Sequence, residues 1–115
     1  MAATLNNQAE LYVKLGQADN AVALFEEAIA IAQDGDMHLA TATLTESYGS
    51  SLIELRRYES AIETLRDAAG RYATLGDSSS EARTTSMLAQ AYEATGETVQ
   101  ASICRERAAR LLVGN

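Results

Sequence analysis

The sequence predicts an all-α protein built as a stack of helix-turn-helix units. Three observations support this fold class. The 115 residues contain no proline and only seven glycines, which suits long helices joined by short turns. Apolar residues recur at helical spacing, and no strand-like alternation competes with them. The chain also aligns with itself twice, which places Tyr12, Leu52 and Tyr92 in one column and indicates three repeated units in one domain, residues 1–115.

The first unit, expected over residues 2–36, contains two apolar stripes separated by a glycine. One stripe covers residues 5–15 and ends at Gly16, and the second covers residues 21–31. The second and third units are expected over residues 37–77 and 78–115. Their predicted helices cover residues 40–55, 58–74, 79–95 and 97–112.

Two linkers, "DGD" at 34–36 and "LGDSSSE" at 75–81, separate the units. Each supplies a glycine to end one helix and an Asp or Ser to cap the next. Asp77, followed by serines and Glu81, is the stronger of the two start signals. The glycines of the two linkers, Gly35 and Gly76, stand one position further apart than the repeat period. This spacing predicts that the two loops differ by one residue.

Small residues recur where neighbouring helices are expected to touch. Because antiparallel helices joined by short turns must pack together, small side chains at these positions let their backbones approach closely. Two columns of the self-alignment have this character: Ala21, Ala61 and Ala101 in the second helices, and Ala9, Gly49 and Ala89 in the first.

Composition disfavours several classes of function. Nine basic and sixteen acidic residues give a net charge of -7, which repels nucleic-acid phosphates and anionic membranes. No apolar run approaches the roughly 20 residues of a membrane span, and the first residues lack the layout of a signal peptide. The single cysteine, Cys104, excludes an internal disulfide, so the cytoplasm is the expected compartment.

The repeating columns resemble the tetratricopeptide repeat, a helix-turn-helix unit with large, small and aromatic residues at fixed positions. The matching residues are Tyr12, Tyr92, Ala21, Ala61, Ala101, Phe25 and the pair Leu88–Ala89. The sequence departs from the family pattern in three ways: the tryptophan column holds Leu5, Thr45 and Thr85, the closing proline is absent, and the period is longer than the family's. A longer period is similar to the extended units of kinesin light chains, spindle-orientation adaptors and large bacterial regulators.

This resemblance implies a right-handed α-solenoid of three repeats and six antiparallel helices. It also implies a non-enzymatic scaffold that binds an extended peptide or helix of a partner protein in a concave groove, without a cofactor. The groove would be lined by the first helix of each unit. The candidate binding residues are Asn6, Asn7, Glu10, Glu46, Ser47, Ser50, Arg83, Met87 and Gln90, and the same face would present Ala3, Val13, Thr43, Glu54, Ser86 and Glu93.

The chemistry of these residues indicates a peptide ligand rather than a catalytic centre. Asn side chains donate and accept hydrogen bonds at once, which suits the backbone of an extended peptide; the alternative for Asn7 is an ordinary solvated helix start. Four groove acids opposed mainly by Lys14 and Arg83 favour a basic or neutral peptide, unless they form a plain solvated face. A clamp for a C-terminal carboxylate is disfavoured, since its columns hold one cation and an added acid.

The remaining reactive residues are interpreted as structural. His38 lies in a linker without the further ligands that a metal site needs, and Cys104 lies on a helix face expected to be buried. Arginines at 105, 107 and 110 complement the dipole at the end of the last helix, the alternative being anion binding. No phosphate loop, zinc-binding pattern or nucleophile motif occurs.

A second hypothesis is that the chain serves assembly: a self-associating or sensory segment of a larger protein, or part of a longer solenoid with neighbouring repeats. The first helix starts almost at Met1 without a capping segment, and Thr45 and Thr85 fill the repeat less than the family pattern expects.

Overall fold

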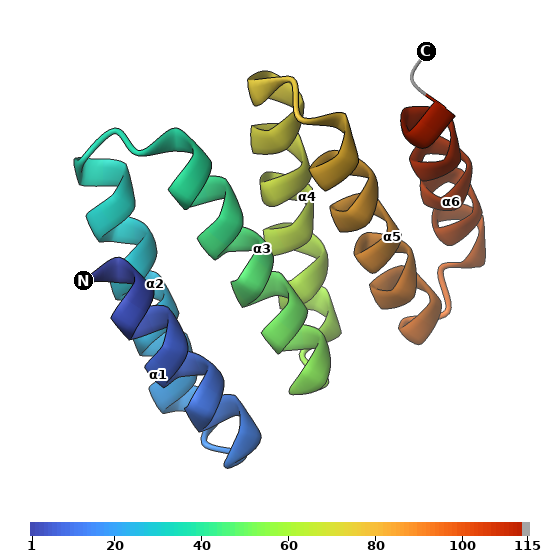
Figure 1. Cartoon of the computed structure of the whole chain (residues 1–115). Helices are drawn as coiled ribbons and strands as arrows, with labels where there is room; N and C mark the ends of the chain where they lie inside the picture. The colour runs from blue at the N-terminus through green and yellow to red at the C-terminus, as the bar shows by residue number, and fades with distance from the viewer. Residues whose placement is uncertain (114–115) are drawn as a thin grey trace.

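The computed structural model describes residues 1–113 and shows six helices, with no strand in that range (Figure 1). The helices run antiparallel in chain order, each packed against the next, so the predicted all-α repeat solenoid is confirmed. The helices predicted for the second and third units begin and end within two residues of the observed ones. The observed bounds are α1 Ala2–Lys14, α2 Ala18–Asp34, α3 His38–Glu54, α4 Tyr58–Leu75, α5 Ser78–Ala94 and α6 Thr98–Val113.

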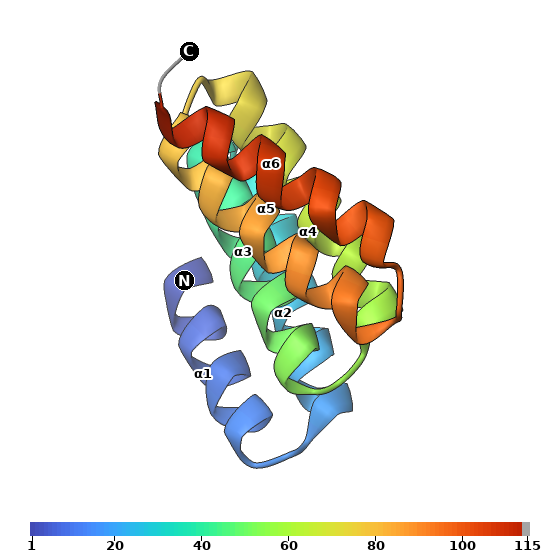
Figure 2. The ribbon, with the colours of Figure 1, turned by 90° about the vertical axis from the view of Figure 1, so that its right-hand side faces the viewer.

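The helices form a slab two layers thick. Figure 1 shows α1 in front of α2 and α3 in front of α4, and the turned view of Figure 2 separates α1 from α2. The principal-axis extents of 36 × 31 × 16 Å fit two layers, since packed helix axes lie about 8–10 Å apart. The first helices of the three pairs therefore share one face of the molecule.

All five turns between helices have the same backbone geometry. Each contains one residue with a positive φ, and these residues are equally spaced along the chain. The N–H of the following residue then donates to a carbonyl five residues earlier, as in the Schellman motif that ends many helices. In the first turn, for example, the Gln17 N–H donates to the Tyr12 carbonyl at 2.9 Å. The five positive-φ residues are Gly16, Asp36, Arg56, Gly76 and Gly96, with φ between 53° and 83°.

The two linkers between units differ in length by one residue, 35–37 against 76–77, as the sequence predicts, although their left-handed residues stand one full repeat apart. The left-handed residue of the first linker is Asp36 and not Gly35, whose φ is -89°. The helix N-cap is then Met37, which makes no side-chain cap bond, so neither Asp nor Ser caps α3. In the second linker the prediction is confirmed, because the Asp77 carboxylate accepts a hydrogen bond from the Ser80 N–H at 3.1 Å.

The predicted small-residue columns lie at the helix contacts. Ala21, Ala61 and Ala101 are all fully buried. Gly49 lies so close to α4 that a Cβ built on it would stand 2.5 Å from the Leu65 side chain. These contacts fix how closely the first and second helices of each unit approach.

Threonines occupy two of the three positions at which the family pattern has tryptophan. Thr45 and Thr85 are buried, and their hydroxyls donate to the carbonyls of Thr41 and Glu81, each at 2.7 Å. Buried hydroxyls are costly only when they lack partners, so this column is polar but satisfied.

Candidate functional site: the hollow between α1 and α3

An open hollow of about 450 Å³ lies between α1 and α3, with one residue contributed by α5. We call it the α1–α3 pocket. Five of the nine candidate residues line it: Glu10, Glu46, Ser47, Ser50 and Met87. Val13 and Glu54, expected on the same face, also line it, together with Lys14 and Ser51. The first helices of three units therefore contribute to one concave site.

The other four candidates lie outside the pocket lining. Asn6 stands one helical turn before Glu10 and is half-buried, and its Oδ1 atom is buried with no hydrogen-bond partner among the described residues. Asn7 and Gln90 are exposed. Arg83 is also exposed, but it reaches the pocket through its ion pair with Glu46.

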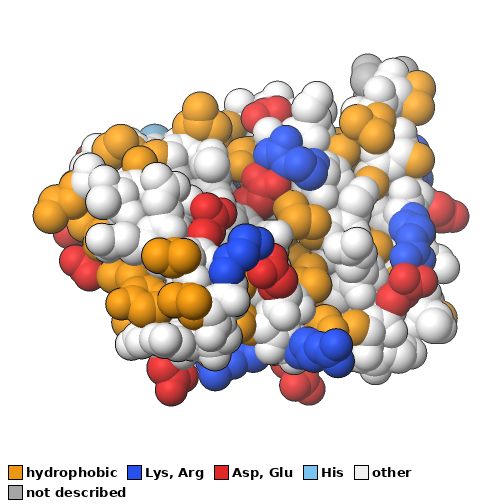
Figure 3. Space-filling model, turned by 60° about the horizontal axis from the view of Figure 1, so that its bottom comes forward, with side chains coloured by type: hydrophobic (Ala, Val, Ile, Leu, Met, Phe, Trp, Pro, Cys, Tyr) orange, Lys and Arg blue, Asp and Glu red, His pale blue; other side chains and the backbone are white. Residues whose placement is uncertain are grey.

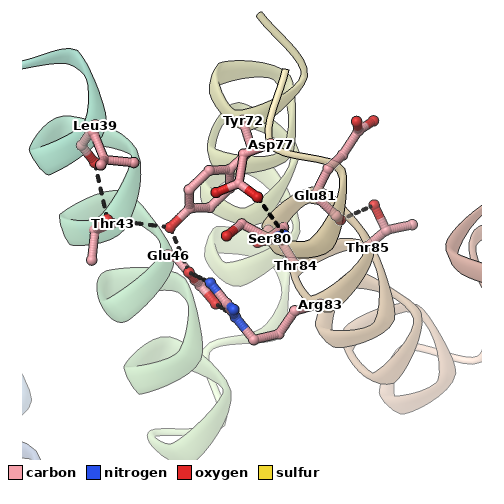
Figure 4. A network of polar contacts seen from close by, with 10 residues as sticks. All are labelled: Leu39, Thr43, Glu46, Tyr72, Asp77, Ser80, Glu81, Arg83, Thr84 and Thr85. Carbon is pink, nitrogen blue, oxygen red and sulfur yellow. Dashed lines mark hydrogen bonds and ion pairs between the residues drawn. The ribbon is translucent and has the colours of Figure 1, made fainter. Parts of the chain in front are cut away.

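Glu46 is held by side chains from two other helices, as the close view in Figure 4 shows. Its carboxylate accepts two hydrogen bonds from the Arg83 guanidinium, at 2.5 and 2.8 Å, and one from the Tyr72 hydroxyl at 2.7 Å. These three residues come from α3, α5 and α4. The Glu46 side chain is only 11% exposed, so the pair is a two-pronged contact closed to water on the carboxylate side.

The electrostatics follow from this geometry. Burial raises the pKa of the Glu46 carboxyl, but the hydrogen bonds from Arg83 and Tyr72 outweigh it and hold the pKa below its ordinary value. The hydrogen bonds to Glu46 raise the pKa of Arg83, and burial raises that of the Tyr72 hydroxyl. Glu46 is therefore ionised and already neutralised by a permanent cation near neutral pH.

The other pocket acids differ in their partners. Glu54 lies 3.7 Å from the Lys14 ammonium, and both side chains are more than half exposed, so the pair contributes only about 0–1 kcal/mol. Glu10 is exposed and forms no ion pair within residues 1–113. Glu10 is thus the pocket carboxylate that a ligand cation would meet first.

Three serines of α3 leave hydroxyl groups at the pocket. Thr41, Thr43 and Thr45 of the same helix donate to carbonyls one turn earlier. No such bond holds the serines within the described residues. Their hydroxyls are available as donors and acceptors, including that of Ser51, although this residue is only 7% exposed. The three serines are Ser47, Ser50 and Ser51.

Ser51 and Tyr72 are not among the residues that the sequence predicts for the site. Ser51 follows the predicted groove residue Ser50 directly and lines the same pocket. Tyr72 lies on a second helix, 26 residues from Glu46, and the sequence carries no signal that joins them. The only available hint was a tyrosine at a column that is otherwise Ala or Leu.

The other reactive residues considered in the sequence lie apart from the α1–α3 pocket lining. Residues 1–113 contain no group of three or more His, Cys, Asp or Glu side chains that would hold a metal ion. His38 is exposed, and Cys104 is buried, which raises the pKa of its thiol. None of the described helices is both long and apolar enough to cross a bilayer.

Two arginines of the last helix are paired rather than free. Arg105 contacts the Glu93 carboxylate at 2.6 Å, and Arg107 contacts that of Glu81 at 2.8 Å. Glu81 is itself buried, so Arg107 compensates a carboxylate inside the third helix pair. These arginines therefore tie α6 to α5.

Stacked antiparallel helix pairs with a hollow on the face of their first helices define a helical-repeat protein, a class that generally binds other proteins. A family model described as tetratricopeptide repeat matches residues 1–74, and the chain belongs to this family. The structure is similar to the TPR domain of Arabidopsis FLU, with a TM-score of 0.84 at 15% sequence identity, covering 99% of this chain and 96% of that one. A search among curated proteins finds no match.

Proposed function

We propose that the chain is a protein-interaction module that holds an extended peptide of a partner in the α1–α3 pocket. The observation that carries this proposal is the hollow itself, about 450 Å³ on the face formed by the first helices. A tetratricopeptide repeat generally mediates protein binding, and this hollow is lined mainly by serine hydroxyls and charged side chains.

The lining indicates which peptide would fit. Ser47, Ser50 and Ser51 offer hydrogen bonds to a peptide backbone, and Val13 with Met87 offers an apolar floor that adapts to different side chains. The electrostatic preference is for a basic side chain. Three carboxylates and one ammonium line the pocket, and the carboxylate without an ion pair among the described residues is Glu10.

The test is selection from a displayed library of random peptides, followed by affinity measurement by fluorescence anisotropy. We expect selected peptides to be enriched in Lys and Arg, and their binding to weaken at least tenfold in Glu10→Lys and Ser50→Lys. Glu59→Lys is the matched control, because Glu59 is an exposed acid on α4 outside the pocket. Asn7→Ala tests the sequence-based candidate that lies outside the lining.

Equal binding by the wild type and Glu10→Lys would contradict the proposed site. Equal loss in Glu59→Lys would show that net charge alone, and not the pocket, governs binding.

Because the proposal is a scaffold function, it includes no catalytic step and no cofactor. We also propose the cytoplasm as its compartment, which the presence of a single cysteine, Cys104, supports.

A further inference from the structure

A second open hollow, of about 620 Å³, lies between two successive units and not at an end of the stack. Within residues 1–113, α4 and α6 both pack on α5 and make no contact with each other, and Figure 1 shows α5 between them. We call this site the α4–α6 hollow. Its buried lining residues are Ile62, Leu88, Tyr92 and Cys104. Its exposed lining residues are Glu59, Glu63, Arg66, Glu97 and Gln100.

The acids of this hollow lack the partners that many other charged residues have. On the face seen in Figure 3, basic side chains lie beside acidic ones, and six ion pairs join residues 1–113. The six pairs include none of the three glutamates of the hollow, and they do not include Arg66. Three carboxylates and one guanidinium leave an excess of two negative charges at this site.

Two polar groups of the core also reach the hollow. Tyr92 and Cys104 are 9% and 7% exposed, so each is more than nine-tenths buried. Within residues 1–113 neither the Tyr92 hydroxyl nor the Cys104 thiol has a hydrogen-bond partner. The hydroxyl is not among the polar atoms sealed from solvent, and the Tyr92 residue lines the hollow. A ligand in the hollow can therefore donate a hydrogen bond to this hydroxyl.

The preceding junction of the solenoid shows which charge is missing here. A shift by one repeat unit carries Glu59 onto Asp19 and Glu97 onto Arg57. Asp19 and Arg57 form an ion pair between α2 and the start of α4, with 3.4 Å between guanidinium nitrogen and carboxylate oxygen. In the junction of α4 with α6 both positions hold a carboxylate, so the cation of the first junction has no counterpart among these residues.

The same comparison accounts for the space. The shift carries Leu88 onto Tyr48, whose ring stacks on that of Phe25 with centroids 5.3 Å apart. The equivalent of Phe25 is Leu65, so two aliphatic side chains replace two stacked rings. The hollow lined by Tyr48 measures about 220 Å³, roughly a third of the hollow lined by Leu88.

We propose that the α4–α6 hollow binds an arginine side chain of a partner protein. Its guanidinium lies between Glu59 and Glu97 and supplies the charge that Arg57 supplies in the preceding junction. Arginine suits this site because its planar head donates to two carboxylates at once, while its methylene groups pack on the apolar floor formed by Ile62 and Leu88. The excess of acid disfavours an anionic ligand.

This site is separate from the peptide site proposed above, because the α4–α6 hollow and the α1–α3 pocket share no lining residue. A peptide held in the α1–α3 pocket should lose affinity in Glu10→Lys and keep it in Glu97→Arg. The two proposals can therefore fail separately.

The test is an NMR titration of the isotope-labelled protein with an alanine peptide that has blocked ends and one central arginine. The backbone amides of Leu88, Tyr92 and Cys104 should shift until they saturate, since these residues line the hollow. The same peptide with citrulline, which keeps the shape of arginine without its charge, should bind at least tenfold more weakly. The amides of Ser47 and Ser50 report separately on the α1–α3 pocket.

Glu97→Arg reproduces the first junction, since it places a guanidinium at the position that Arg57 holds there. It should occupy the site from within the chain and weaken peptide binding at the hollow at least tenfold. Glu27→Arg is the matched control. It makes the same change of charge at an exposed residue of α2 outside both sites, and it should bind like the wild type. Because both positions are exposed, both variants are expected to fold, which circular dichroism checks.

Four results would overturn the proposal. Shifts confined to the lining of the α1–α3 pocket would show that arginine does not enter the hollow. Equal affinity for the citrulline peptide would exclude recognition of charge. Unchanged binding in Glu97→Arg would place the ligand elsewhere. Equal loss in Glu97→Arg and Glu27→Arg would show that net charge, and not the hollow, governs binding.

Discussion

The same substitution, glycine to alanine, is expected to have opposite effects at two helical positions of this fold. Gly49 lies in α3 and Gly70 in α4, so both replacements gain the same intrinsic helix propensity, about 1 kcal/mol. The surroundings differ. A Cβ on Gly70 would meet nothing within 4 Å, whereas a Cβ on Gly49 would stand 2.5 and 2.6 Å from two carbons of Leu65.

The loss of stability expected for Gly49→Ala depends on how far the Leu65 side chain can move. Carbon atoms in contact prefer separations of about 3.5–4.0 Å, so Leu65 would have to retreat by roughly 1 Å. Leu65 is fully buried, and overpacking a filled core costs about 1–3 kcal/mol. After the propensity gain, Gly49→Ala should destabilise the fold by up to about 2 kcal/mol. Gly70→Ala should stabilise it by about 1 kcal/mol.

Thermal and urea unfolding followed by circular dichroism measure both effects. A change of about 1 kcal/mol moves the midpoint of a domain of this size by roughly 4 °C, so Gly70→Ala should melt higher and Gly49→Ala lower than the wild type. An unchanged urea m-value would confirm that the native and unfolded states are the same species. A Gly49→Ala protein as stable as the Gly70→Ala protein would refute the close contact between α3 and α4.

Three further outcomes are expected. Arg56→Gly should raise the unfolding free energy by about 1 kcal/mol in urea melts, because Arg56 holds a φ of 63° that glycine adopts without strain. As pH falls below 4.5, the wild type should lose stability that Glu46→Gln does not lose, since the folded-state pKa of Glu46 lies below its ordinary value; parallel pH curves would contradict this. Cys104 should react slowly with a thiol reagent in the native protein and rapidly in urea, because burial raises its pKa and limits access; equal rates would contradict its burial.

The helices and most of the turns were predictable from the sequence, but the left-handed residue of the linker at 34–36 was not. Apolar periodicity and small residues indicate the helices directly, because each helix buries one face against its neighbours. The linker "DGD" predicts Gly35 as the left-handed residue, yet the stack places Asp36 there. Regular packing of the units spaces the turns equally, and this tertiary demand outweighs the local preference of glycine, at a cost of about 1 kcal/mol.

For the candidate site, the sequence indicates which face of the molecule a side chain lies on, but not which side chain it pairs with. The family resemblance implies that Glu10, Glu46 and Ser50 share a face, and all three line the α1–α3 pocket. It does not indicate which charges neutralise one another, because Glu46 meets partners 26 and 37 residues away on two other helices. From the sequence alone, Glu46 and Arg83 would be expected to be two unpaired charges in the groove. In the folded chain they cancel, so the attraction for a basic ligand depends on Glu10, and Glu10→Lys should weaken peptide binding more than any change at Arg83.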